Sequence, residues 1–571
     1  MMRAWKINEN GHADNIRQLT EELMVSPVIS TLLVQRGITN YTQAKAFFRP
    51  YISQLYDPFL MADMEKAVSR LEKALKNKEK ILVYGDYDVD GTTSVAMVFS
   101  FLKKYTGTVD YYIPDRYAEG YGVSFRGIDH AIQHGFSLII ALDCGIKAVD
   151  KVAYARENNI DFIICDHHTP GDMLPDAVAV LDPERHDSGY PFKYLSGCGV
   201  GFKMLQAYAL RNNIPFEEIA VYLDLLAVSI ASDIVPVIDE NRILACYGLK
   251  KLNEDPCMGL QAIITIAGLH EKTITLDDIV FKIGPRINAA GRIESGKQAV
   301  ELLVSTTTEE ARVHCDKIDI HNQTRRNIDK TITEEALQEI AAKSDKYKYT
   351  TVLFNPSWHK GVVGIVASRL IENYYRPTIV LTESNGFATG SARSIPGFDL
   401  YKAISECADL MESFGGHTYA AGLTLKLENV QKLRDRFEEV VKNSITPDLL
   451  VSQIEIDAEL NFKEITPKFF RVLKQFEPFG PENMNPVFFA ENVSDNGYAR
   501  VVGADEEHLQ LGLIQEEIPF NVFRAIAFNQ AQHLRKIKNG SSFDIAFTLV
   551  ENNFRGNTSI QLNIKDIKIA K

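Results

Sequence analysis

The sequence predicts an α/β protein with a parallel sheet, a second α/β lobe and an all-β barrel at the C-terminal end. Three observations predict this architecture. Short apolar runs alternate with helical patterns from about 78 to 182, a long charged helical segment follows at 308–343, and short alternating runs fill the chain from about 450 onward. Alternating strands and helices are typical of a parallel sheet covered by helices, whereas short strands between turns are typical of small barrels.

The composition is that of an ordinary globular protein with several domains. The 571 residues, 45% of them hydrophobic, are enough for three or four cores. No apolar signal region or membrane span is present, so we expect a cytoplasmic protein without a membrane partner. Seven cysteines without a Cys-x-x-Cys pair indicate neither a disulfide framework nor a thiolate zinc site. The net charge of −13 argues against nucleic acid, but metal-binding carboxylates contribute to that sum.

The first α/β segment contains five predicted strands. They lie at 81–84, 109–113, 138–142, 160–165 and 177–181. Three of them run into residue types that carry chemistry: the first into an acidic loop, the third into Asp143, and the fourth into His167 and His168. Because ligands of open α/β sheets bind where strands end, we expect these side chains to converge.

The acidic loop holds three carboxylates at alternate positions. In an extended segment Asp86, Asp88 and Asp90 would point to the same side and repel one another unless protons or metal ions lay between them. An EF-hand loop beginning at Asp86 would need a glutamate at its twelfth position, where this chain has Met97. A solvated acidic turn is disfavoured because a buried helical pattern follows the loop directly. A divalent metal is the simplest interpretation.

Later segments add one more carboxylate and two arginines. Asp233 ends a helix-like apolar stretch, where a negative charge is unfavourable for the helix dipole, so a cation beside it is indicated. Arg286 and Arg292 flank a small-residue turn and suit phosphate oxygens, although arginines so spaced are more often surface ion-pair formers. In the second lobe, at about 348–446, glycines beside basic and hydroxyl residues allow a backbone to approach an anion closely.

Five or six carboxylates with an imidazole suit manganese or magnesium better than zinc or a redox metal. They are also more acidic ligands than one ion requires. Two ions that share a carboxylate are the standard arrangement for phosphoryl hydrolysis. No Walker lysine motif and no Ser-His-Asp order offers another mechanism. The residues therefore predict a two-metal phosphoesterase.

Six motifs, in this order, resemble the DHH phosphoesterase superfamily, and within it the bacterial single-stranded-DNA-specific exonucleases. They are Gly-Asp-Tyr-Asp-Val-Asp-Gly, Leu-Asp-Cys-Gly, Asp-His-His, Ala-Ser-Asp-Ile-Val-Pro, Gly-Pro-Arg-Ile-Asn-Ala-Ala-Gly-Arg and Phe-Gly-Gly-His-x-x-Ala-Ala-Gly. The resemblance covers nearly the whole chain and implies five parts. These are a helical segment (1–75), a DHH domain (76–304), a connecting helix (305–345), a DHH-associated domain (346–446) and an OB-fold nucleic-acid-binding domain (447–571).

The resemblance also implies roles for individual residues. The implied metal ligands are Asp86, Asp88, Asp90, Asp143, His167 and Asp233. The implied catalytic group is Asp143, His167, His168 and Asp166, with His168 facing the scissile phosphate and Asp166 orienting the imidazoles. The implied substrate contacts are Arg286 and Arg292 on the strand backbone, Arg116, Ser391 and Arg393 on a 5′ phosphate, Tyr121 on a base, and His417 from the glycine-histidine motif.

One position departs from the superfamily pattern. Many members carry histidine where this chain has Tyr84. If that position is a ligand, the metal set here is one short, and we expect Asp86 to replace it.

The implied activity is a 5′-to-3′ exonuclease on single-stranded DNA that releases mononucleotides with two Mn²⁺ or Mg²⁺ ions and acts in recombination and repair. The implied partners are a 5′ DNA end, single-strand-binding protein and a RecQ-type helicase, with the enzyme itself a monomer. Two alternatives remain. One is a DHH phosphoesterase on short oligonucleotides, whose chains usually lack the barrel, and the other is a non-catalytic replication scaffold, which the filled ligand positions disfavour.

Overall fold

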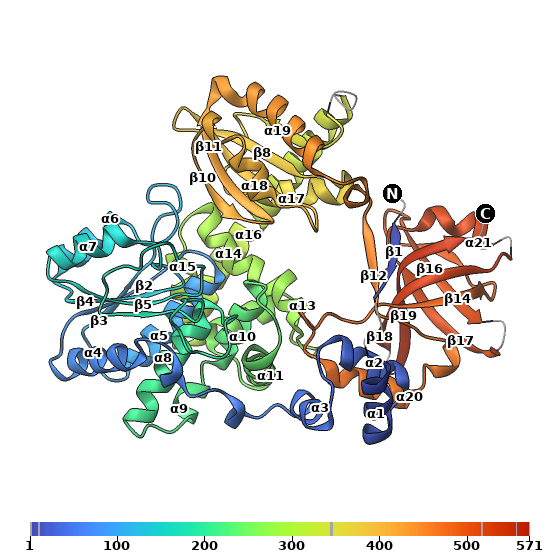
Figure 1. Ribbon diagram of the computed structural model, residues 1–571, viewed down its shortest axis with the longest axis horizontal. Coiled ribbons are helices and arrows are strands. Elements are labelled where there is room, and N and C mark those ends of the chain that lie inside the picture. Colours follow the sequence, from blue (N-terminus) through green and yellow to red (C-terminus); the bar gives the residue numbers. More distant parts are fainter. Residues whose placement is uncertain are drawn as a thin grey trace. The chain divides into compact units, whose positions relative to one another are not determined.

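The computed structural model describes residues 3–8, 12–342, 347–515, 518–538, 540–554 and 557–569. The chain forms two compact units (Figure 1). One comprises Met1–Gln54, Pro236–Ile238 and Gln453–Lys571, and the other comprises Leu55–Val235 and Asp239–Ser452. Among the helices of the described ranges, none combines the length and the apolar content that crossing a membrane requires.

The second of these units begins with a five-stranded parallel sheet in the order β3-β2-β4-β5-β6. Its strands are β2 (Ile81–Gly85), β3 (Val109–Tyr112), β4 (Leu138–Leu142), β5 (Asp161–Cys165) and β6 (Ala179–Leu181). All five predicted strands are therefore present, with small shifts at their ends. Because the chain adds β3 on one side of β2 and β4 on the other, the topological switch point lies between β2 and β4.

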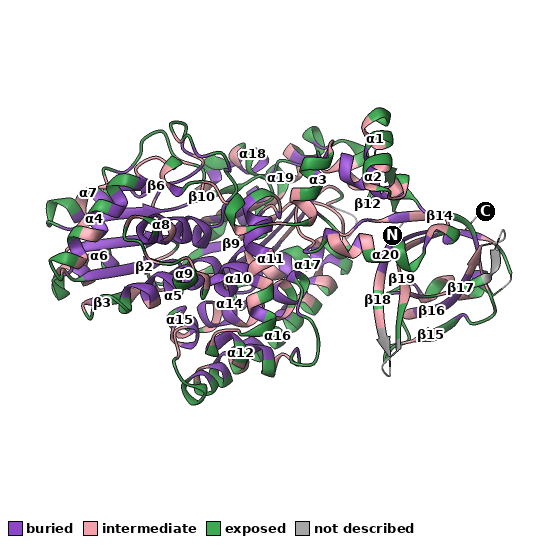
Figure 2. Cartoon of the chain, turned by 90° about the horizontal axis from the view of Figure 1, so that it is seen from below, coloured by how far each residue is buried: buried purple, intermediate pink, exposed green. Residues whose placement is uncertain are grey.

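Helices cover both faces of this sheet (Figure 1). On one face lie α6 (Phe125–His134) and α7 (Val149–Glu157), and on the other lie α4 (Met64–Lys76), α5 (Val89–Lys103) and α8 (Gly197–Arg211). Cover on both faces explains why β2 and β4 are apolar and buried throughout (Figure 2). Further helices are α9 (Glu217–Ala220), α10 (Leu223–Ser232), α11 (Asp239–Glu254), α12 (Met258–Ile266), α13 (Leu276–Asp278), α14 (Gly284–Ile293) and α15 (Lys297–Leu303).

The predicted long helix is α16 (Thr308–Ala342), and residue 343 of the predicted range lies outside the described residues. It contacts α12, α14 and α15 on one side and α17 (Val363–Asn373) of the second lobe on the other. A single helix thus connects the two lobes of this unit.

The second lobe is a mixed sheet in the order β10-β11-β9-β8-β7, in which only the pair β7–β8 is parallel. Its strands are β7 (Thr351–Phe354), β8 (Thr378–Ser384), β9 (Phe387–Arg393), β10 (Met411–His417) and β11 (Ala420–Lys426). With α17, α18 (Leu400–Ser405) and α19 (Val430–Ser444), this confirms the predicted second α/β lobe.

The other unit contains a closed barrel. Its five strands are β14 (Phe488–Asp495), β16 (His508–Gln515), β17 (Ile518–Ala527), β18 (Phe543–Phe554) and β19 (Asn557–Ile569). They pair in the ring β14-β18-β19-β17-β16-β14, with β17–β19 as the parallel pair. This is the strand order of an OB-fold and confirms the predicted barrel. Short elements flank it: β13 (Ala458–Glu459), β15 (Arg500–Val502), α20 (Pro467–Leu473) and α21 (Leu534–Ile537).

The N-terminal residues differ from the prediction of helices alone. Ala4–Ile7 forms strand β1, which pairs in parallel with β12 (Gln453–Ile456). The helices α1 (Ala13–Leu23), α2 (Pro27–Gln35) and α3 (Tyr41–Phe48) follow, and Leu19 and Ile29 share one core with barrel residues such as Phe488. A four-residue strand is too short to show a period, and its partner lies at the other end of the sequence.

Candidate metal centre

The predicted ligands gather at the carboxyl ends of the strands beside the switch point. Asp86 directly follows β2, Asp143 directly follows β4, and His167 lies just after β5. Asp88 is the N-cap of α5, with its Oδ1 accepting a 2.9 Å hydrogen bond from the N–H of Gly91. The sheet and its connections therefore bring together residues that are far apart in sequence.

Two overlapping groups have ligand atoms close enough to hold an ion. In each group these atoms lie within 4.8 Å of one another: Asp143, His167 and His168 form the first, and Asp90, His167 and Asp233 form the second. Asp233 is the residue after α10 and closes that helix as its C-cap, as its sequence position predicted.

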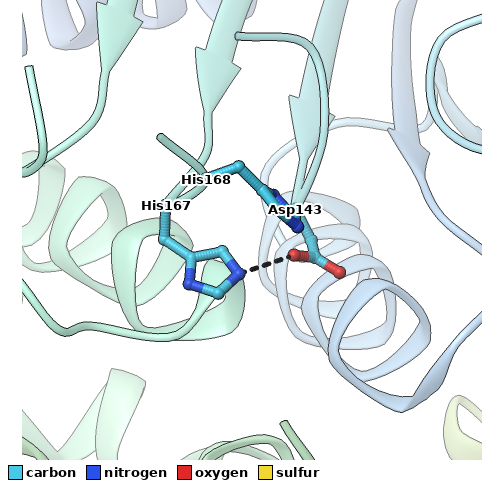
Figure 3. A group of neighbouring side chains, drawn as sticks. All are labelled: Asp143, His167 and His168. Carbon is cyan, nitrogen blue, oxygen red and sulfur yellow. Dashed lines mark ion pairs between the residues drawn. The ribbon is translucent and has the colours of Figure 1, made fainter. Parts of the chain in front are cut away.

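His167 belongs to both groups, and Figure 3 shows its ring directed toward Asp143. Its Nε2 atom lies 3.2 Å from Asp143 Oδ1, 3.6 Å from Asp233 Oδ2 and 3.9 Å from Asp90 Oδ2. Burial, and then the charges of Asp90 and Asp88, raise the pKa of Asp143 well above its usual value. An arrangement of this kind is stable only with protons or cations among the carboxylates.

Several buried ligand atoms have no hydrogen-bond partner among the residues that the structure describes. Both carboxylate oxygens of Asp143, Oδ2 of Asp86 and Nε2 of His167 are unpartnered. Buried polar groups are normally hydrogen-bonded, so the unpartnered atoms of Asp143 and His167, which lie together in one ligand group, indicate a metal site. Carboxylate oxygens with one imidazole nitrogen fit a divalent ion of the manganese or magnesium type.

Asp90 is held by the start of α8. Its Oδ2 accepts from the N–H of Gly197 at 2.7 Å, and its Oδ1 accepts from the N–H of Cys198 at 2.8 Å and from the Ser229 hydroxyl at 2.7 Å. A Cβ atom at Gly197 would lie 2.5 Å from the Cβ of Asp143. The glycine therefore lets the positive end of α8 approach both carboxylates.

Asp166 orients His168. Its Oδ1 accepts from His168 Nδ1 at 2.7 Å, and its Oδ2 accepts from the N–H of Ile146 at 2.9 Å. Burial lowers the pKa of His168, but Asp166 outweighs that effect and raises it to about 9. The ion pair with Asp166 therefore favours the imidazolium form of His168, and its Nε2 lies 3.3 Å from the Tyr121 hydroxyl.

A cluster of arginines lies between the two lobes of this unit. Arg292 is half-buried, and its Nη1 donates to the carbonyl of Gly361 at 3.0 Å. Burial, and then the charges of Arg116, Arg325 and Arg393, lower the pKa of Arg292 to about 9. Arginines from α14, α16 and β9 thus share one region, which indicates an anion as their partner.

The start of α17 forms one wall of this cluster. Arg393 Nη1 donates to Ser391 Oγ at 2.5 Å. A Cβ atom at Gly364 would lie 2.9 Å from Arg393 Nη2 and 3.1 Å from Ser391 Oγ, so the glycine lets the helix N-terminus come close to both. Arg116 lies 4.8 Å from the centre of the Tyr87 ring. A helix N-terminus beside arginines and a hydroxyl is chemically suited to a phosphate.

The remaining predicted substrate residues lie in three settings. Arg286 is paired with Asp319 through a 3.1 Å contact and joins α14 to α16, so its guanidinium already has a carboxylate partner. Tyr121 is 53% exposed, and its ring packs edge-to-face against Tyr87. His417 ends β10 on the second lobe, where burial, and then the charge of His168 from the first lobe, lower its pKa.

Other residues around the centre did not stand out in the sequence. Ser229 lies within an apolar helix, and Arg325 is one of many charges on α16, so no pattern marks either of them. Asp182 could have been found, because the predicted strand 177–181 runs directly into it. Burial raises its pKa to about 8, and its Oδ1 accepts from the N–H of Glu184 at 2.7 Å.

Tyr84, at the position that departs from the superfamily pattern, is fully buried and holds a loop. Its hydroxyl donates to the carbonyl of Gly122 at 3.0 Å and accepts from the N–H of Ser124 at 3.1 Å. The N–H of Gly122 in turn donates to Asp86 Oδ1 at 3.2 Å. The tyrosine therefore fixes the loop that orients Asp86.

Replacing Tyr84 by phenylalanine is expected to lower the free energy of unfolding by about 1–3 kcal/mol, because the buried Gly122 and Ser124 groups lose their partner. Chemical denaturation measures the change. The matched control is Tyr154→Phe, whose hydroxyl binds Asp129 at 2.8 Å near solvent and should matter by less than about 0.5 kcal/mol. Equal losses in the two variants would contradict the role given to Tyr84.

Comparison with known proteins gives consistent results along the chain. Family models match residues 80–230 (DHH family, N-terminal domain), 344–443 (DHHA1 domain) and 456–566 (RecJ OB domain). The chain is 37% identical over 569 residues to the single-stranded-DNA-specific exonuclease RecJ of Bacillus subtilis, covering 99% of this chain and 71% of that protein. It is 32% identical to RecJ of Escherichia coli, covering 97% of each.

Among solved structures, the chain is similar to RecJ of Thermus thermophilus in complex with Mn²⁺. The TM-score is 0.85 at 26% identity, and the match covers 100% of this chain and 80% of that one. The similarity thus extends through both units of the chain.

Proposed function

Because the chain belongs to the RecJ family of single-stranded-DNA-specific exonucleases, we propose that it hydrolyses single-stranded DNA from the 5′ end and releases mononucleotides. The observation that carries the chemistry is the set of unpartnered buried ligand atoms around His167. It supports a phosphodiesterase dependent on divalent metal.

The proposed cofactor is a pair of Mn²⁺ or Mg²⁺ ions. Two groups of ligand atoms that share His167, together with the Mn²⁺ complex of the Thermus relative, support this proposal. The residues that would hold the ions are Asp86, Asp88, Asp90, Asp143, His167 and Asp233. When bound, such ions supply Lewis acidity to a phosphate and lower the pKa of water.

The side chains beside the ligands position the phosphate. Asp166 fixes the ring of His168 through a 2.7 Å hydrogen bond, which leaves the Nε2 proton of His168 for a phosphate oxygen. We propose that Tyr121, which lies next to this nitrogen and is exposed, stacks on a base of the strand. His417 approaches from the second lobe and is proposed to contact the same phosphate.

The arginine cluster is the proposed pocket for the terminal 5′ phosphate. We propose that Arg116, Ser391 and Arg393 bind it, while Arg292 and Arg286 steady the backbone that follows. Water adds to the phosphorus that joins the first nucleotide to the second. The bond between this phosphorus and the 3′ oxygen of the first nucleotide then breaks. The first nucleotide leaves with its own 5′ phosphate, and the shortened strand ends in a new one. Each cleavage thus regenerates the group that the pocket recognises.

The wider setting of the enzyme is also proposed. We propose that the enzyme is a monomer that acts in DNA recombination and repair in the cytoplasm. Its proposed partners are single-strand-binding protein and a RecQ-type helicase, because the substrate must first be unwound. The five domain limits given by the resemblance, 1–75, 76–304, 305–345, 346–446 and 447–571, are retained as a proposal. Similarity to RecJ over nearly the whole chain, barrel included, favours this function over a short-oligonucleotide phosphoesterase or a scaffold.

Digestion of single-stranded DNA labelled separately at each end tests the function. With Mn²⁺ present, we expect the 5′ label to appear first as a mononucleotide while the 3′ label stays on shrinking strands. Strands with a 5′ phosphate should be cut faster than strands with a 5′ hydroxyl or a blocked end. Cleavage of oligomers of a few nucleotides only, or release of the 3′ label first, would refute the proposal.

A further inference from the structure

The connecting helix α16 carries a buried carboxylate at the point where it passes from one lobe to the other. Among the buried residues of α16, a helix described over its whole length, Asp329 alone is charged. Before it on the helix, Asp319 pairs with Arg286 of α14, which belongs to the first lobe. After it, Ile332 shares an apolar core with Trp358 of the second lobe. Asp329 therefore lies between the two lobes.

Three arginines from three different helices surround Asp329. Its Oδ2 atom lies 2.8 Å from Nη2 of Arg369 on α17. Arg325 lies one turn earlier on α16, and Arg292 lies on α14. Burial raises the pKa of Asp329, and the charges of these three arginines act against that rise. One carboxylate is thus the shared counter-charge of cations from the first lobe, the connecting helix and the second lobe.

Arg325 is held from both directions along its own helix. Its Nη2 donates to Oδ1 of the buried Asn322 at 2.8 Å, and Asp329 lies one turn further on. Burial lowers the pKa of Arg325, and the charge of Asp329 opposes this. The Nε atom of Arg325 is buried and has no hydrogen-bond partner within the described ranges. The helix therefore orients this arginine and leaves it one unused donor in the arginine cluster.

Arg369 connects the same carboxylate to the wall of the proposed phosphate pocket. It lies on α17, the helix whose start approaches Arg393 closely because Gly364 has no side chain. Apolar contacts, such as those of Val366 in the core shared with α16, are not directional. The ion pair between Asp329 and Arg369 joins two defined atoms instead, so it sets where α17 lies along α16.

On the basis of the function proposed above, we propose that Asp329 is a positioning residue for recognition of the terminal 5′ phosphate. It orients Arg325 directly and α17 through Arg369, and it does not touch the strand. Stability alone does not explain a charge at this place, because replacing a buried ion pair by apolar side chains is often neutral or stabilising. A carboxylate that only weakened the field of the arginines would have the opposite effect on binding, since its removal would then strengthen the attraction for every strand.

Binding of two (dT) strands of about ten nucleotides, one with a 5′ phosphate and one with a 5′ hydroxyl, tests this role. The strands are labelled at the 3′ end, the full chain carries Asp143→Ala to prevent digestion, and fluorescence anisotropy gives both dissociation constants. Asp329→Asn keeps the shape of the side chain and removes its charge. We expect about tenfold weaker binding of the phosphorylated strand and less than about twofold change for the other. The matched control is Asp316→Asn, an exposed carboxylate on the same helix, which should keep the preference.

Arg369→Gln tests the connection through α17 and serves as a second variant if Asp329→Asn does not fold. It should also weaken binding of the phosphorylated strand more than binding of the hydroxyl strand. The double variant with Asp329→Asn should lose no more of the preference than Asp329→Asn alone, because both changes remove the same ion pair. Additive losses would show that Arg369 acts on the strand independently of Asp329.

An unchanged preference in Asp329→Asn, or tighter binding of both strands, would overturn the proposal. So would the absence of any phosphate preference in the background protein. Hydrolysis of the same strands by the wild-type chain is measured in parallel and separates the two proposals. If the wild-type chain does not hydrolyse them but Asp329→Asn loses the binding preference, the proposed function fails and the positioning role stands. If hydrolysis proceeds from the 5′ end and the preference survives in Asp329→Asn, the reverse holds.

Discussion

Replacing Asp143 by alanine is expected to reduce hydrolysis of single-stranded DNA at least about 1000-fold, because Asp143 belongs to one of the two ligand groups that would hold the proposed ions. Within the described ranges, its carboxylate oxygens have no hydrogen-bond partner. Removing it gives up the 3.2 Å contact with His167 Nε2 but relieves repulsion with Asp90 and Asp88. The variant should be folded, with a metal-free unfolding temperature no lower than that of the wild type.

Thermal unfolding with and without Mn²⁺ separates loss of metal from loss of fold. The wild type should gain about 2.7 kcal/mol of stability at a hundredfold excess of Mn²⁺ over its dissociation constant, whereas Asp143→Ala should gain much less. Asp172→Ala, an exposed carboxylate close in sequence, is the control and should behave like wild type in both assays. Retained hydrolysis, or an unchanged response to Mn²⁺, would remove Asp143 from the metal centre.

Replacing Arg393 by glutamine is expected to lower kcat/KM for strands with a 5′ phosphate about 100-fold, because one charged partner of the phosphate is lost. For strands with a 5′ hydroxyl, kcat/KM should change by less than about threefold. The variant would then no longer prefer strands with a 5′ phosphate over strands with a 5′ hydroxyl. Comparison of initial rates on the two substrates measures this.

The control for this variant is Arg436→Gln in the same lobe, where the arginine forms a surface ion pair with Asp409. It should retain the wild-type preference for phosphorylated ends. A proportional loss on both substrates in Arg393→Gln would show that Arg393 acts on the strand in general and not on its terminal phosphate.

Much of the fold follows from patterns that extend over several residues. The strands β2, β4 and β5 are apolar runs bounded by turns, and α16 is a charged helical segment without proline or glycine, so all of them could be predicted. Strand β1 could not, because it depends on a distant partner, β12. The local sequence shows the hydrophobic period of a helix or strand, but it does not show which other element will pair or pack with it.

The same distinction applies to the site. Asp86, Asp143 and His167 could be singled out because each follows a strand, and parallel strands end at one edge of the sheet. The partner of Arg286 could not be foreseen, because Asp319 lies on another helix. The place of Arg325 in the arginine cluster could not be foreseen either, because its neighbours in the cluster come from other elements of the fold.

The close approach of α8 to Asp143 has a consequence for how tolerant the chain is of mutation. At Gly197 a methyl group would overlap with Asp143, and at Gly364 it would crowd Arg393. Neither glycine has a side chain that could bind metal or DNA. Any other residue at either position would nevertheless displace a side chain that is proposed to bind one of them. In a survey of permitted substitutions, these two positions would therefore be as restricted as the ligands themselves.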